Sequence, residues 1–283
     1  MAVAAGIFGA ALAHAQTMPS SIGVDWNKPH DPFKLFGNAY YVGTASLSAV
    51  LITSDQGHIL LDGAVKDSPP LIAANIKALG FRIEDVKLIV NYHVHFDHAG
   101  GLAGLQKMSG AVVKASPSSA AVLRTGKLGP DDPQFDPSTR IPAVANVEIV
   151  SDGETLKVGS LAITAHFTPG HTPGGTTWTW KSCEGTRCLN IVYADSLNPI
   201  SGAAFKYSAG QGQAAGTFRS SIAKFRTLPC DVIVAVHPEF SGLWDSLKRR
   251  DAGEKDALID TTACRRYTDN ATVALDKRLA TEK

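Results

Sequence analysis

The stretch His93-Val94-His95-Phe96-Asp97-His98-Ala99-Gly100-Gly101 places four metal-binding side chains within six positions. Along an extended chain, positions 93, 95 and 97 point to one side, so His98 joins them only if the chain turns at Asp97. The small residues that follow permit such a turn. Three imidazoles and one carboxylate are more ligands than one zinc ion with an open position needs. The stretch therefore predicts two metal ions.

Two further histidines follow expected strands. His171 lies in Pro169-Gly170-His171-Thr172-Pro173-Gly174-Gly175, whose prolines and glycines predict a tight loop that aims one imidazole inward. His237 ends the apolar run 232–236 and precedes Pro238. Taken alone, each also fits an ordinary residue at a strand end. With both included, each metal ion has three protein ligands and keeps room for water.

Apolar runs separated by turn signals predict a layered fold. We expect strands at residues 34–42, 47–53, 58–62, 86–90, 111–114, 147–150, 154–157, 161–167, 176–180, 189–194 and 232–236. We expect helices at residues 69–79, 99–108, 217–228 and over most of 256–283, and long loops at 126–142 and 195–212. Two sets of strands, each with helices, predict an α/β fold, an αββα sandwich of two mixed β-sheets with helices on the outer faces. No linker divides it, so residues 16–283 form one expected domain.

The N-terminus has the features of an export signal. Residues 2–13 are small and apolar, and Ala13-His14-Ala15 fits the cleavage rule. We expect a signal peptide over residues 1–15 and a mature periplasmic protein. Because the segment lacks Lys and Arg, a disordered leader or a mis-assigned start codon is the alternative. No stretch reaches the about 18 apolar residues of a membrane span.

The four cysteines suit an oxidising compartment. Cys183 and Cys188 flank a hairpin-like turn and can pair locally, which leaves Cys230 with Cys264. Four free thiols or a structural zinc site are the alternatives.

The charge balance argues against polyanionic partners. Lys and Arg number 27 and Asp and Glu number 26, for a net charge of +1. We therefore expect no nucleic-acid partner and no membrane partner, and we expect a monomer. A Gly-x-Ser-x-Gly elbow is absent from the sequence, so we expect no serine nucleophile of that type.

The pattern His93-x-His95-x-Asp97-His98 followed by Gly100-Gly101 resembles the signature of the metallo-β-lactamase superfamily. Other stretches resemble subclass B3 of the true β-lactamases, from about residue 30 to residue 265. They are residues 36–44, 60–63, 168–174, 193–197, 228–231 and 237–238.

The resemblance implies two zinc ions with three ligands each. The first set is His93, His95 and His171, and the second set is Asp97, His98 and His237.

The resemblance also implies supporting roles. Asp62 matches a carboxylate that orients a ligand histidine, and the Cys230–Cys264 pairing resembles the same subclass. Ser196 stands where other subclasses have a cysteine ligand, and it is expected to bind the substrate with Asn198. The chain departs from the pattern at Asn198, where Ser or Thr is common, and at Phe96, where small or aliphatic residues are common.

The implied function is a zinc-dependent β-lactamase that confers antibiotic resistance. A metal-bound hydroxide, oriented by Asp97, would hydrolyse the amide bond of a small-molecule β-lactam. The alternative is another hydrolase of the same fold that acts on a lactone, a thioester or a phosphodiester. A protein that only binds zinc is a third possibility, but it would have closed metal sites without water.

Overall fold

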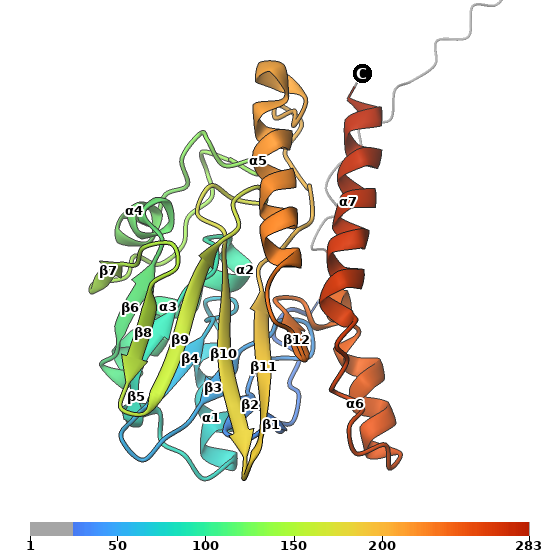
Figure 1. The fold of residues 1–283 in the computed structure, drawn as a ribbon. Coiled ribbons are helices and arrows are strands. Elements are labelled where there is room, and N and C mark those ends of the chain that lie inside the picture. The colour runs from blue at the N-terminus through green and yellow to red at the C-terminus, as the bar shows by residue number, and fades with distance from the viewer. Residues whose placement is uncertain (1–24, 283) are drawn as a thin grey trace, which may run out of the picture.

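The computed structural model describes residues 25–282. Two β-sheets pack face to face and helices cover the outer face of each, which confirms the predicted αββα sandwich (Figure 1). The signal peptide predicted at residues 1–15 lies outside the described residues. Among the described residues, no helix combines the length and the apolar character that a bilayer crossing requires.

The first sheet carries the larger share of the strands. In spatial order it contains β1 (Phe33–Phe36), β2 (Ala39–Tyr41), β3 (Val50–Ile52), β4 (His58–Leu61), β5 (Val86–Val90), β6 (Val112–Ala115) and β7 (Val147–Ile149). Neighbouring strands run antiparallel from β1 to β4 and parallel from β4 to β7. The sheet is therefore mixed, as predicted.

The second sheet is mostly antiparallel. In spatial order it contains β12 (Val232–Ala235), β11 (Arg187–Ala194), β10 (Thr176–Glu184), β9 (Leu161–Phe167) and β8 (Thr155–Val158). Only the pair of β11 and β12 is parallel. The carboxyl ends of β11 and β12 therefore lie together, and each is followed by residues of the predicted site.

Helices form the two outer layers (Figure 1). Those on the first sheet are α1 (Pro69–Ala78), α2 (Phe96–Ala99), α3 (Leu102–Ser109) and α4 (Pro117–Thr125). Those beside the second sheet are α5 (Ala209–Arg226), α6 (Leu243–Asp251) and α7 (Ala263–Thr281). Short 3-10 turns occupy Ile83–Asp85 and Pro238–Ser241.

Three apolar clusters hold these layers together. The cluster between the sheets includes the fully buried rings of Tyr41, Trp178 and Tyr193. A second cluster joins the first sheet to α1, α3 and α4, and a third joins the second sheet to α5 and α7. Strands β5, β11 and β12, which lead into the predicted site, are thus packed on both faces.

Where the sequence predicted one helix at residues 99–108, the structure has two. Helix α2 ends at Ala99, and α3 begins at Leu102. The break lies where the segment after β4 crosses the chain, and a Cβ atom on Gly101 would collide with the carbonyl oxygen of Gly63. Helices α4 and α6 were not predicted, and α5 begins at Ala209 instead of residue 217.

Two disulfide bonds close loops of different length. Cys183 pairs with Cys188 across the β10–β11 hairpin, at a sequence separation of 5. Cys230 pairs with Cys264 at a separation of 34, which ties the segment before β12 to the first turn of α7.

The loop lengths predict unequal contributions to stability. Replacing Cys230 and Cys264 with serine should lower the free energy of unfolding by about 4 kcal/mol, because the open chain regains the entropy of a long loop. The same change at Cys183 and Cys188 should cost about 2 kcal/mol. Urea denaturation followed by circular dichroism measures both. A larger loss from the hairpin bridge would contradict this ranking.

Candidate metal centre

Strand β5 leads directly into the histidine-rich stretch. The strand ends at Val90 and the chain bends at Tyr92; His95 is extended, and α2 then begins at Phe96. The backbone N–H of Ala99 donates to the carbonyl of His95 at 2.8 Å, which closes this helical turn. The turn that the sequence required for His98 to join the site is therefore present, but it starts at Phe96, one residue before Asp97. Helical geometry sets the directions of Asp97 and His98, so Asp97 does not share one side with His93 and His95.

His171 lies in a tight loop between β9 and β10. The N–H of Thr168 donates to the carbonyl of Gly175 at 2.8 Å, and the N–H of Gly170 donates to that of Thr172 at 3.0 Å. Gly170 has a φ of 148°, and a Cβ atom there would press on the ring of Phe218 at 2.5 Å. The loop can pack against α5 only because this residue is glycine.

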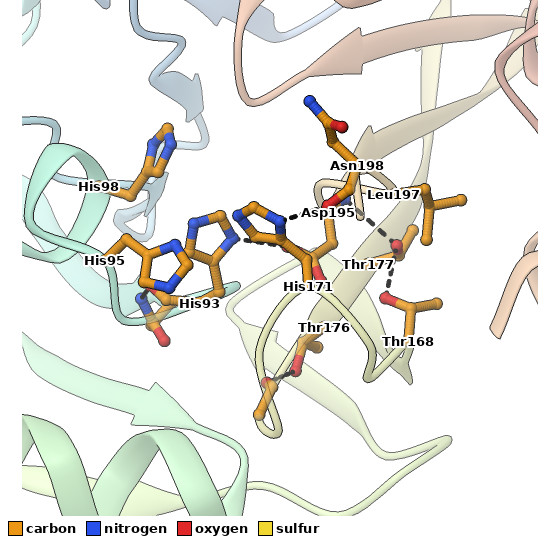
Figure 2. A network of polar contacts seen from close by, with 12 residues as sticks. His93, His95, His98, Thr168, His171, Thr176, Thr177, Asp195, Leu197 and Asn198 are labelled. Atoms are coloured by element: carbon orange, nitrogen blue, oxygen red, sulfur yellow. Dashed lines mark hydrogen bonds and ion pairs between the residues drawn. The ribbon is translucent and has the colours of Figure 1, made fainter. Parts of the chain in front are cut away.

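The six predicted ligands form two groups of three. His93, His95 and His171 make one group, and Asp97, His98 and His237 make the other. Within each group the candidate ligand atoms lie within 4.8 Å of one another. Figure 2 shows the rings of the first group turned toward each other. Below we call these groups the first and second triad.

The second triad is compact. The Nε2 atoms of His98 and His237 are 3.2 Å apart, and Asp97 Oδ2 lies 3.3 Å from the former and 3.5 Å from the latter. His237 follows β12 and precedes the 3-10 turn, as the sequence suggests. Its Nδ1 lies 3.3 Å from the carbonyl oxygen of Ser46, which leaves Nε2 facing the other two groups.

Buried carboxyl groups orient the histidines by contacting the ring nitrogen that faces away from the triad. His93 Nδ1 lies 2.8 Å from Asp195 Oδ1, as the dashed line in Figure 2 shows. His98 Nδ1 lies 3.3 Å from Asp62 Oδ2, which also accepts a hydrogen bond from the Tyr193 hydroxyl at 3.0 Å. Because each acid takes one ring nitrogen, the opposite nitrogen faces the triad. His171 is held similarly by the carbonyl oxygen of Asn198, at 2.7 Å.

Asp132 and Gln134 belong to the site, although their residue types and spacing gave no signal. The buried carboxylate of Asp132 lies 3.1 Å from His95 Nε2. The side-chain nitrogen of Gln134 lies 3.3 Å from His95 Nδ1 and 3.4 Å from His171 Nε2, the nitrogens that face the triad. The only available hint was the length of the loop 126–142, since long loops are often functional.

Burial sets the protonation states. Desolvation lowers the pKa of His93 and of His98 well below the ordinary range, and it lowers the pKa of His171 to about 3. These imidazoles are therefore neutral at pH 7. Burial would raise the pKa of Asp97, but its hydrogen bond to His237 and that residue's charge outweigh burial, so the pKa is lowered. An ionised carboxylate and neutral rings are the forms that bind metals.

An unpaired nitrogen supports a metal in the first triad. His93 Nε2 is buried and has no hydrogen-bond partner, and the same is true of Asp195 Oδ2 behind it. Burial also raises the pKa of Asp195 and of Asp62 well above its usual range, so a nearby cation would favour their ionised forms. The residues present therefore fit divalent metal ions that prefer imidazole and carboxylate ligands.

Asp195 and the remaining predicted residues lie around the triads. Asp195 belongs to neither group of three, and its contact is with the His93 ring. Ser196 is buried and Asn198 is half-buried beside His171 (Figure 2). Phe96 is 45% exposed, and its ring lies 6.4 Å from the ring of Trp26, so it forms part of the rim.

Comparisons with known proteins agree with this geometry. The model of the metallo-beta-lactamase superfamily matches residues 42–182. The solved Rm3 metallo-beta-lactamase is 53% identical, with a TM-score of 0.88, over 91% of this chain and 96% of that chain. MEM-A1, a subclass B3 metallo-beta-lactamase from a soil metagenome library, is 48% identical with a TM-score of 0.88, over 91% and 98%.

A curated relative from Burkholderia pseudomallei, named "probable metallo-hydrolase", is 30% identical over 48% of each chain. This chain spans about half the length of the curated relatives that it matches. The solved relatives, by contrast, are covered almost completely, and their sheets and helices superpose on those described above. The chain therefore belongs to the metallo-β-lactamase superfamily, and the relatives that it matches over nearly its whole length include a subclass B3 enzyme.

Proposed function

We propose that this protein is a dizinc β-lactamase that hydrolyses the amide bond of β-lactam antibiotics. The observation that carries the proposal is the pair of triads, which offers three ligands to each of two metal ions. Solved relatives at 53% and 48% identity, both metallo-beta-lactamases, support the choice of substrate.

In this proposal the first triad holds one zinc ion and the second triad holds the other. When bound, the two ions supply Lewis acidity toward the lactam carbonyl and lower the pKa of a coordinated water to about 7. Neither triad contains a cysteine, and all four cysteines are paired in disulfides. The donor set is thus imidazole and carboxylate throughout.

Asp97 has a second proposed role, which is to orient the attacking water. Because His237 holds its pKa below the ordinary range, the carboxylate is ionised at neutral pH. It is 13% exposed, so it borders the open side of the second triad. A carboxylate in this position accepts a hydrogen bond from the attacking water and orients it toward the carbonyl carbon.

Ser196 and Asn198 are proposed to bind the carboxylate of the substrate. Asn198 uses its backbone carbonyl to hold His171, which leaves its side-chain amide free to donate to an anion. The amide of Gln134 reaches the opposite side of the first triad. Donors therefore flank the place where the lactam must lie.

Export completes the proposal. Two disulfides and the B3 relatives support a periplasmic protein with residues 1–15 as a signal peptide and residues 16–283 as one mature, monomeric domain. In that compartment the enzyme would meet β-lactams before they reach their targets and so confer resistance.

Metal removal tests the core of the proposal. Dialysis against EDTA should abolish nitrocefin hydrolysis, and two equivalents of zinc for each chain should restore it, because both triads must be filled. Metal analysis by mass spectrometry should find two zinc ions in the wild type and about one in Asp97→Ala, with turnover at least about 100-fold lower. Activity that survives complete metal removal would sink the mechanism.

A substrate panel separates the lactamase from the other hydrolases of this fold. Penicillin and a carbapenem should be hydrolysed, whereas an acyl-homoserine lactone and S-lactoylglutathione should not. Faster hydrolysis of the lactone or the thioester would assign the protein to the alternative function.

Asp132 should strengthen zinc binding through His95. Asp132→Asn should lower the affinity of the first site by about 10- to 100-fold, because the ring loses the acid that orients it. Asp131→Asn, at the exposed neighbouring position, is the matched control. Competition with a chromophoric chelator measures both. Equal affinities in the two variants would show that His95 needs no such support.

Asn198 should affect substrate binding more than turnover. Asn198→Ala should raise the KM for nitrocefin roughly tenfold with little change in kcat, because a hydrogen bond to a charged carboxylate is lost. Zinc content, measured in parallel, should stay at the wild-type value, since His171 bonds to the backbone of residue 198. An unchanged KM would remove Asn198 from the substrate site.

A further inference from the structure

A groove opens beside the metal centre. It has a volume of about 350 Å³ and lies between residues 197–198, the 3-10 turn Pro238–Ser241 and helix α7. Its lining includes Leu197, Asn198, Glu239, Phe240, Tyr267 and Asn270. None of these residues belongs to either triad.

Both triads border this groove. Asn198, on one wall, accepts the hydrogen bond from His171 of the first triad at 2.7 Å. Phe240, on the opposite wall, has its ring 5.1 Å from the ring of His237 of the second triad. The groove therefore lies next to the place where the lactam ring is proposed to bind.

The floor of the groove is rigid. Tyr267 is buried, and its hydroxyl donates to the carbonyl of Asp195 at 2.7 Å. The same hydroxyl accepts the backbone N–H of Leu197 at 3.4 Å. These bonds tie α7 to the loop that also carries Asn198, so the groove has a defined shape before a ligand enters.

The polar groups of the groove favour a cation. Glu239 is exposed, and none of the ion pairs among residues 25–282 includes it. Phe240, the next residue, is 41% exposed and presents its ring to the same space. A free carboxylate beside an aromatic face is the arrangement that binds ammonium groups. Arg266, one turn before Asn270, is already paired with Asp260 at 2.8 Å.

We propose that this groove binds a positively charged substituent of the β-lactam, with Glu239 as the counter-charge and Phe240 as the apolar face. The inference rests on the proposed function, and it adds a preference among lactams. Ser196 and Asn198 would hold the carboxylate of the lactam nucleus, whereas Glu239, on the turn after β12, would attract a cation in the groove. A substituent that carries a second carboxylate should be disfavoured.

Two carbapenems with the same nucleus test the proposal. One carries an ammonium group on its C2 substituent, and the other carries a neutral group of similar size. In the wild type, the KM of the ammonium lactam should be the lower of the two. Glu239→Gln should raise that KM about three- to fivefold, the effect of losing one solvent-exposed charge pair. The KM of the neutral lactam and of nitrocefin should stay unchanged.

Further variants isolate the charge from general effects. Glu239→Lys should reverse the preference, and Phe240→Leu should reduce it about two- to threefold by removing the aromatic face. Glu148→Gln is the matched control, because Glu148 is an exposed glutamate on β7, at the far side of the molecule from α7 (Figure 1). Added salt should shrink the preference in the wild type but not in Glu239→Gln.

The outcomes separate the two proposals. If the wild type hydrolyses none of the three lactams, the proposed function is wrong and the groove has no lactam to bind. If all three are hydrolysed but Glu239→Gln changes both carbapenems equally or not at all, the charge preference is overturned while the lactamase stands. Circular dichroism melting curves of each variant ensure that a lost preference does not reflect unfolding.

Discussion

The pairing of a buried carboxyl group with the far nitrogen of a ligand histidine is the constraint on which this structure depends. Asp195, Asp132 and Asp62 each hold one imidazole, and each comes from a different part of the chain. A buried acid is costly unless it is compensated, and a buried ring without a partner is poorly oriented. With a cation at a triad, the charge of the buried acid is compensated and the ring is oriented. The acid, the ring and the cation therefore stabilise one another.

The two-sheet architecture explains how such distant residues meet. His93 follows β5 of the first sheet, whereas Asp195 follows β11 of the second, and the two side chains lie 2.8 Å apart. Each strand is fixed by apolar packing on both faces, so the polar groups at the strand ends are placed by the cores rather than by their own contacts. The polar groups of the site can therefore be positioned precisely without relying on stabilising contacts within the site.

The sequence predicted the layers and singled out the 93–98 stretch because both are encoded locally. Strand β5 was placed correctly from its apolar run, and His93, His95, Asp97 and His98 stood out as candidate ligands by their density. His171 and His237 carried no such local signal, and the family resemblance added them to the candidate set. Asp132 was not predicted, because an acidic residue in an irregular loop has the same sequence features as a solvent-exposed one. Only the tertiary structure brings it to His95. The turn at Phe96 was misplaced by one residue, since periodicity does not reveal where an extended chain becomes helical.

The long disulfide has a consequence for how the centre matures. Cys264 lies one turn before Tyr267, whose hydroxyl holds the chain at Asp195, and Asp195 in turn orients His93. Anchoring α7 to the segment before β12 therefore also anchors the scaffold of the first triad. Oxidation of these two thiols therefore stiffens the frame on which the first triad is built, although neither cysteine touches that triad.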